Sequence, residues 1–76
     1  MEREQSAIEL LTDIAMDGAR VLVERQRAID ALTLFHERAL PALRKIEKKT
    51  DMDVLRERAR LYIQRIEAGA AISMTL

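Results

Sequence analysis

Mostly apolar residues recur at alternating intervals of three and four along the first two thirds of the chain. The series consists of Ile8, Leu11, Ala15, Gly18, Leu22, Arg25, Ile29, Leu32, His36, Ala39, Leu43 and Ile46. This spacing is typical of one face of an α-helix. A neighbouring row at seven-residue intervals, from Ala7 to Ala42, widens the apolar face to about three positions in seven. The pattern predicts one long amphipathic helix over about residues 6–49.

Three local signals bear on that helix. Ser6 and Glu9 have the spacing of a capping box and predict its start. Asp17-Gly18 is a typical turn dipeptide, but Gly18 falls on the apolar face, so we predict that the helix continues through it. The alternative is a turn at Gly18 that gives a monomeric three-helix bundle. Pro41 lies opposite the apolar face and predicts a bend rather than a break.

A second, shorter helix follows after a brief connection. Thr50 and Asp51 are both suitable N-cap residues, and apolar residues with helical spacing continue to Ile66. Gly69 is a suitable residue to end this helix. We therefore predict a short helix over about 51–68, antiparallel to the long one, and an apolar tail over 70–76 that covers the open end of the bundle. The alternative for the tail is a strand that adds to an edge of another protein. The fold class is all-α, an αα-hairpin within a single helical domain over residues 1–76.

The chain is short for the apolar surface that it carries. A domain of 76 residues buries a modest share of its surface, and this chain has no cysteine with which to form a disulfide. The predicted long helix is about twice the length of the short one, so a hairpin leaves part of its apolar face uncovered. We therefore predict a homodimeric helical bundle. Its predicted interface residues are Ala15, Gly18, Leu22, Arg25, Ile29, Leu32, His36, Val54 and Leu61. We expect Arg25 to meet an acidic residue of the other copy or to set the orientation of the two chains.

Charge is unevenly distributed although the net charge is zero. Residues 1–24 hold six acidic and two basic residues, whereas residues 25–50 hold seven basic and three acidic ones. Two antiparallel copies of the predicted long helix place each acidic half against a basic half. Because exposed ion pairs contribute little stability individually, this asymmetry favours the antiparallel orientation of the two copies but adds little to the affinity between them.

Residues that carry chemistry are scarce. The single histidine has no second histidine or cysteine with which to form a metal site. There is no nucleophile pattern and no glycine-rich phosphate loop. No apolar run reaches the length of a membrane span, and the charged start does not resemble a signal peptide. We expect a non-enzymatic cytoplasmic protein without a cofactor or a metal.

The remaining feature is a mixed apolar and basic face on the predicted long helix. Its residues are Met16, Arg20, Val23 and Arg27, a combination that is common in protein-binding surfaces. We predict a small regulator, inhibitor or adaptor, of the kind that bacteria and phages encode in short genes, that occludes another protein. One alternative is a nucleic-acid-binding regulator that uses Arg38, Arg44, Lys45, Lys48 and Lys49. Another is a structural subunit of a larger assembly.

Overall fold

The protein is helical throughout its described length. The computed structural model describes the backbone of residues 2–75 and the side chains of residues 3–70. Within this range the elements are α1 (Glu2–Met16), α2 (Leu22–Leu32), a 3-10 segment η1 (Thr33–Ala39), α3 (Leu40–Lys49) and α4 (Asp53–Thr75). No strand occurs in residues 2–75. The all-α prediction is confirmed.

The predicted continuous helix is wrong at Gly18. α1 ends at Met16, and the chain turns back over residues 17–21 into α2. The Asp17 side chain makes this turn, because its Oδ1 accepts a hydrogen bond from the Ala19 amide at 2.9 Å. The Asp17 carbonyl also accepts from the Arg20 amide at 3.1 Å. A turn at Gly18, which the alternative prediction required, is therefore present, and α1 and α2 pack against each other.

The helix is interrupted a second time before the proline. α2 ends at Leu32, and η1 contains His36 with φ of 51° and ψ of −128°, which is not helical. Pro41 then lies in the first turn of α3. A proline is tolerated there because amides of the first turn have no partner within the helix. The predicted bend within one helix is thus a break followed by a new helix.

The terminal helices differ from the prediction at both ends. α1 starts at Glu2, so Ser6 lies inside it and does not cap it. α4 starts after Met52, whose carbonyl accepts from the Leu55 amide at 3.2 Å, while Thr50 is the C-cap residue of α3. Gly69 does not stop α4, whose backbone stays helical to Thr75. The predicted packing of the apolar tail concerns side chains that lie outside the described residues.

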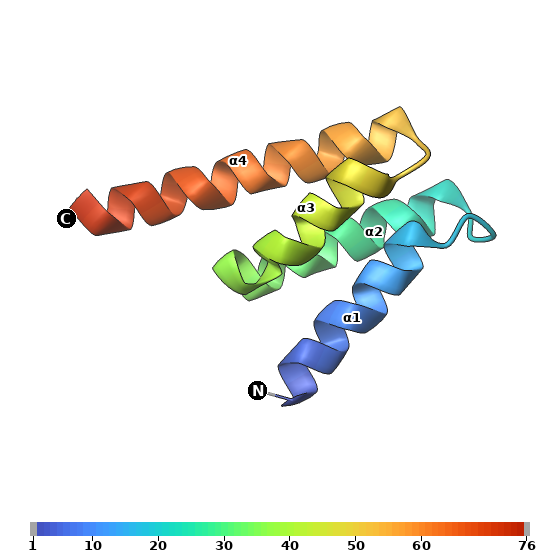
Figure 1. Ribbon diagram of the computed structural model, residues 1–76, viewed down its shortest axis with the longest axis horizontal. Coiled ribbons are helices and arrows are strands. Elements are labelled where there is room, and N and C mark those ends of the chain that lie inside the picture. The colour runs from blue at the N-terminus through green and yellow to red at the C-terminus, as the bar shows by residue number, and fades with distance from the viewer. Residues whose placement is uncertain (1, 76) are drawn as a thin grey trace.

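The core forms where the four helices meet. α2 packs on α1 and α4, and α3 packs on the same two helices, whereas α1 and α4 make no contact within the described part of the chain. Figure 1 shows α1 and α4 at opposite edges, with the 17–21 and 50–52 connections at the same end of the molecule. The completely buried large side chains are Ile29, Leu32, Leu43, Ile46 and Leu55.

Candidate functional site

A buried arginine holds the end of the molecule where the two connections meet. Arg25, on α2, is only 2% exposed. Its Nε donates to the Ala15 carbonyl oxygen at 2.8 Å, and its Nη2 donates to Asp51 Oδ1 at 3.1 Å. Its Nη1 lies 3.5 Å from the sulfur of Met52. One guanidinium therefore joins the last turn of α1, the start of α2 and the α3–α4 connection.

The acidic partner of Arg25 belongs to the same chain. The prediction that Arg25 meets an acid of another copy is therefore corrected, because the turn at Asp17 brings α2 back toward the α3–α4 connection. The hydrogen bond from Arg25 lowers the pKa of Asp51, because it favours the ionised carboxylate. Burying a charge is costly unless it is paired and hydrogen-bonded, and this guanidinium is both.

Three consecutive apolar side chains are exposed shortly before Arg25 in the chain. Val21, Leu22 and Val23 are 60%, 37% and 50% exposed at the start of α2. Exposed arginines lie before and after them at Arg20 and Arg27. We call these five residues the corner patch. Val21 has an extended backbone, with φ of −67° and ψ of 152°, and its carbonyl accepts the Glu24 amide at 3.1 Å. The patch is therefore built on a defined helix start.

The corner patch includes three of the four predicted partner-binding residues. Arg20, Val23 and Arg27 are exposed there, whereas Met16, at the end of α1, is half-buried against the core. Sequence reasoning missed Val21, because a continuous helix assigned it to the apolar face. The available signal was the run of three apolar residues after Arg20, since three consecutive positions cannot all share one helix face.

The predicted dimer-interface residues fall into two groups. The side chains that the chain's own helices already bury are Ala15, Arg25, Ile29 and Leu32. The residues of this set that remain exposed are Gly18, Leu22, His36, Val54 and Leu61. The first group is covered because the turn at residues 17–21 folds α1 against α2. The middle of the predicted dimer interface therefore belongs to the core of a single chain.

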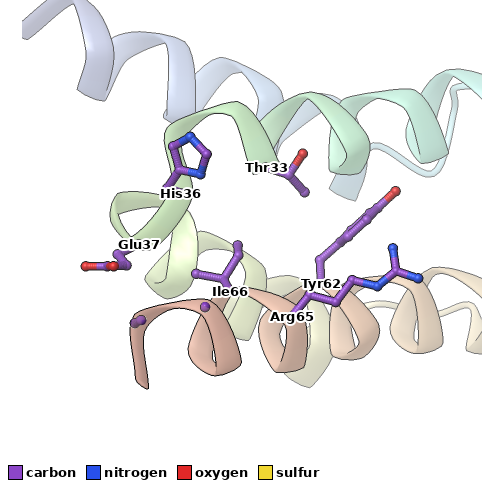
Figure 2. A pocket seen from close by; sticks show the side chains of 8 residues that line it. Thr33, His36, Glu37, Tyr62, Arg65 and Ile66 are labelled. Carbon is purple, nitrogen blue, oxygen red and sulfur yellow. The ribbon is translucent and has the colours of Figure 1, made fainter. Parts of the chain in front are cut away.

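A groove lies at the other end of the molecule, between η1 and α4. It has a volume of about 490 Å³ and is lined by Thr33, His36, Glu37, Tyr62, Arg65, Ile66, Gly69 and Ala70. Figure 2 shows Ile66 pointing from α4 into the space below η1, while the Glu37 side chain points away. The groove combines an apolar floor with a cationic side chain, Arg65, that makes no ion pair among the described residues.

Tyr62, which lines this groove, belongs to a polar cluster that joins α4 to α2. Asp30 Oδ1 accepts a hydrogen bond from the Tyr62 hydroxyl at 2.5 Å and one from Arg58 Nη1 at 2.9 Å. The hydrogen bond to the Asp30 carboxylate, together with burial, raises the pKa of Tyr62, because the neutral phenol is the form that donates. The cluster fixes α2 alongside α4.

His36 lines the same groove in a strained conformation. It is the single non-glycine residue with positive φ in the described part of the chain, and its side chain is exposed. A residue with a Cβ pays about 1–3 kcal/mol in such sparsely populated regions. The prediction that His36 lies on a helical interface face is corrected, because the helix ends before it.

The basic residues of the nucleic-acid alternative do not form one unpaired cluster. Arg38 pairs with Glu4 at 2.5 Å and Arg44 pairs with Glu67 at 2.5 Å. The hydrogen bond from Arg38 lowers the pKa of Glu4. The three lysines of the set, Lys45, Lys48 and Lys49, are exposed. Two of the five predicted phosphate-binding cations therefore already have an acidic partner within the chain, while their side chains stay 73% and 54% exposed.

Neither the remaining side chains nor known relatives identify a ligand for these surfaces. Among the described residues, no group of three or more histidine, cysteine, aspartate or glutamate side chains is placed to hold a metal ion. None of the described helices combines the length and the apolar character that crossing a membrane requires. Comparison with protein-family models, with curated proteins and with solved structures finds no match.

Proposed function

We propose that this protein is a small non-enzymatic regulator or adaptor that binds another protein through the corner patch and occludes part of its surface. The observation that carries the proposal is the exposure of Val21, Leu22 and Val23 between two arginines. Apolar side chains mixed with arginine are typical of binding surfaces, whereas single scattered apolar residues are not informative.

The size of the patch defines what the partner must supply. Full burial of a valine or leucine contributes about 1.5–3 kcal/mol, so covering three half-exposed side chains contributes roughly 2–4 kcal/mol. A micromolar complex requires about 8 kcal/mol. The three apolar side chains therefore do not supply a micromolar affinity alone, and the partner must also cover the surface around them. That surface includes Arg27 and Arg20, which already pairs with Asp17 at 3.6 Å. We infer that its surface has an apolar centre with carboxylates at its rim.

The buried Arg25 near the patch supports this role. Arg25 follows Val23 by two residues on α2, and its hydrogen bonds tie α2 to α1 and to the α3–α4 connection. A surface that is rigid before binding loses less conformational entropy when the complex forms. The corner patch is therefore better suited to a preformed interface than a loop of the same composition.

Affinity capture with matched variants tests the proposal. The immobilised protein is exposed to an extract of its native cell, with and without nuclease, and the bound species are identified. We expect a protein that survives nuclease and is lost with Val23→Asp. The control is Leu10→Asp, since Leu10 is an exposed leucine on α1. Circular dichroism verifies that both variants fold.

Two outcomes contradict the proposal. One is recovery of the same partner with Val23→Asp at the wild-type level. The other is recovery of nucleic acid alone, which favours the alternative based on the exposed lysines. In that case the measured affinity falls steeply with added salt, because phosphate contacts release counterions.

A further inference from the structure

The chain is built from two helical hairpins that one short segment joins. α1 packs on α2 to form the first hairpin, and α3 packs on α4 to form the second. The link between them is η1 (Thr33–Ala39). Figure 1 shows this link at the end of the molecule opposite the 17–21 and 50–52 connections. A change confined to η1 can therefore separate the two hairpins without altering the turn inside either one.

The surface between the two hairpins is specific. Asp30 of the first hairpin accepts hydrogen bonds from Arg58 at 2.9 Å and from the Tyr62 hydroxyl at 2.5 Å, both on the second hairpin. The buried apolar residues of both hairpins belong to one hydrophobic core. None of these contacts requires that the two hairpins belong to the same copy of the chain. The second hairpin of another copy therefore fits the same surface with the same contacts.

The link is strained in this closed arrangement. His36 has φ of 51° and ψ of −128°, and it is the single non-glycine residue with positive φ in the described part of the chain. A backbone conformation of this kind is costly for a residue that has a Cβ. The sequence of residues 33–39 contains no glycine that could make the turn at lower cost. A short link under strain favours the exchange of elements between copies.

The sequence of the link also suits a second, unstrained conformation. The helical spacing of three and four runs through it, with His36 between Leu32 and Ala39. When His36 becomes helical, α2 runs on toward α3 and the two hairpins of one chain move apart. Pro41 bends such a helix, because a proline clashes with the carbonyl of the residue four positions before it. This bend opposes the opening of the link, whereas the strain at His36 favours it.

We propose that two copies of this chain exchange their second hairpins and form a twofold dimer. In this dimer η1 opens into a bent helix, and α3–α4 of each copy packs on α1–α2 of the other. The contacts between the hairpins are kept, while the surroundings of η1 change, including the exposed ion pair of Arg38 with Glu4. The strain at His36 is relieved in both copies. The closed monomer and the exchanged dimer therefore contain the same core and differ mainly at the link.

Exchange requires that the two hairpins of a chain first separate. Separation exposes the shared core, so the monomer and the dimer interconvert slowly, and the protein concentration during refolding decides how much dimer forms. The corner patch lies on the first hairpin, which the exchange leaves unaltered. The proposed function and the exchanged dimer can therefore fail separately.

Two substitutions of His36 test the link. Glycine adopts positive φ without strain and is a poor helix former, so His36→Gly favours the closed monomer. Alanine keeps the strain and is the best helix former, so His36→Ala favours the exchanged dimer. Both variants lack the imidazole, so the difference between them reports the backbone alone.

Refolding from urea at a series of protein concentrations, followed by size-exclusion chromatography with light scattering, measures the effect. At equal concentration we expect a dimer-to-monomer ratio at least about tenfold higher for His36→Ala than for His36→Gly, because a dimer contains two links. The wild type carries the same strain as His36→Ala, and we expect it to form dimer at the highest concentrations.

Charge reversal tests whether the hairpins are exchanged. In Asp30→Arg and in Arg58→Asp, like charges face each other within the closed chain. An exchanged dimer with one copy of each variant contains one wild-type pair and one reversed pair, so both halves of the dimer regain opposite charges. We expect the refolded mixture to give mainly this heterodimer in native mass spectrometry. The control is the double variant Asp30→Arg/Arg58→Asp, which restores a pair within one chain and is expected to fold as the wild type does.

Three results overturn the proposal. One is that the wild type and His36→Ala both stay monomeric after refolding at millimolar concentration. Another is that His36→Gly dimerises as strongly as His36→Ala. The third is that the mixed charge variants form no more heterodimer than random pairing gives, because two closed monomers in contact do not bring residue 30 of one copy to residue 58 of the other.

Discussion

Replacing Arg25 by methionine tests whether this side chain holds α1, α2 and the α3–α4 connection together. Methionine has a similar length but cannot donate to the Ala15 carbonyl or to Asp51. The Ala15 carbonyl belongs to a completely buried residue, and leaving it without a donor costs about 1–3 kcal/mol. Asp51 loses little, because its side chain is 69% exposed and water can replace the guanidinium. We therefore expect Arg25→Met to lower the free energy of unfolding by about 1–3 kcal/mol.

Urea unfolding followed by circular dichroism measures this difference. For a domain of this size each kcal/mol corresponds to about 4–8 °C in Tm, so thermal unfolding gives an independent value. Arg27→Met is the control, because Arg27 is exposed on the same helix. A buried ion pair can sometimes be replaced by apolar residues with a gain in stability. If Arg25→Met is as stable as Arg27→Met or more stable, Arg25 does not hold the corner together and the reasoning is refuted.

Three further predictions concern single groups. His36→Gly should raise the free energy of unfolding by about 1 kcal/mol, because relief of strain exceeds the entropy cost of glycine, whereas His36→Ala should not, as measured by urea unfolding. The Arg25–Asp51 pair stabilises the fold fully above the unfolded pKa of an aspartate, about 3.9, and this part of the free energy of unfolding should be lost as pH falls through the lowered pKa of Asp51. Urea unfolding at several pH values should show this loss in the wild type and not in Asp51→Asn. Tyr62 is the single tyrosine, so its phenolate absorbance should titrate above about 10 in the wild type and at lower pH in Asp30→Asn; equal midpoints contradict the hydrogen bond.

The sequence predicted the helical class and much of the core, but not the chain path. Ile29, Leu32, Leu43 and Ile46 lie on the predicted apolar face and are completely buried. Periodicity reports which side of a helix is apolar, and it is the same whether the next helix continues or folds back. The turn at Asp17 is held by a side-chain hydrogen bond to the Ala19 amide and by backbone hydrogen bonds. Its sequence signal was the Asp17-Gly18 dipeptide, which we set aside because Gly18 also fits the apolar spacing.

The candidate surfaces were predictable only in part. Arg20, Val23 and Arg27 were identified because they lie off the apolar face, while Val21 was missed for the reason that the helix was assumed to continue. The groove joins residues 33–37 to residues 62–70. No local sequence signal reports a contact over that separation, and the strained backbone of His36 results from the packing of the elements on either side of it.

The central claim, that the corner patch is the binding surface for another protein, is tested most directly by amide hydrogen exchange. Exchange is measured for the chain alone and for its complex with the protein recovered by affinity capture. We predict that binding slows exchange over residues 20–27 and leaves residues 62–70 unchanged. Slower exchange confined to 33–37 and 62–70, with residues 20–27 unaffected, would contradict the account.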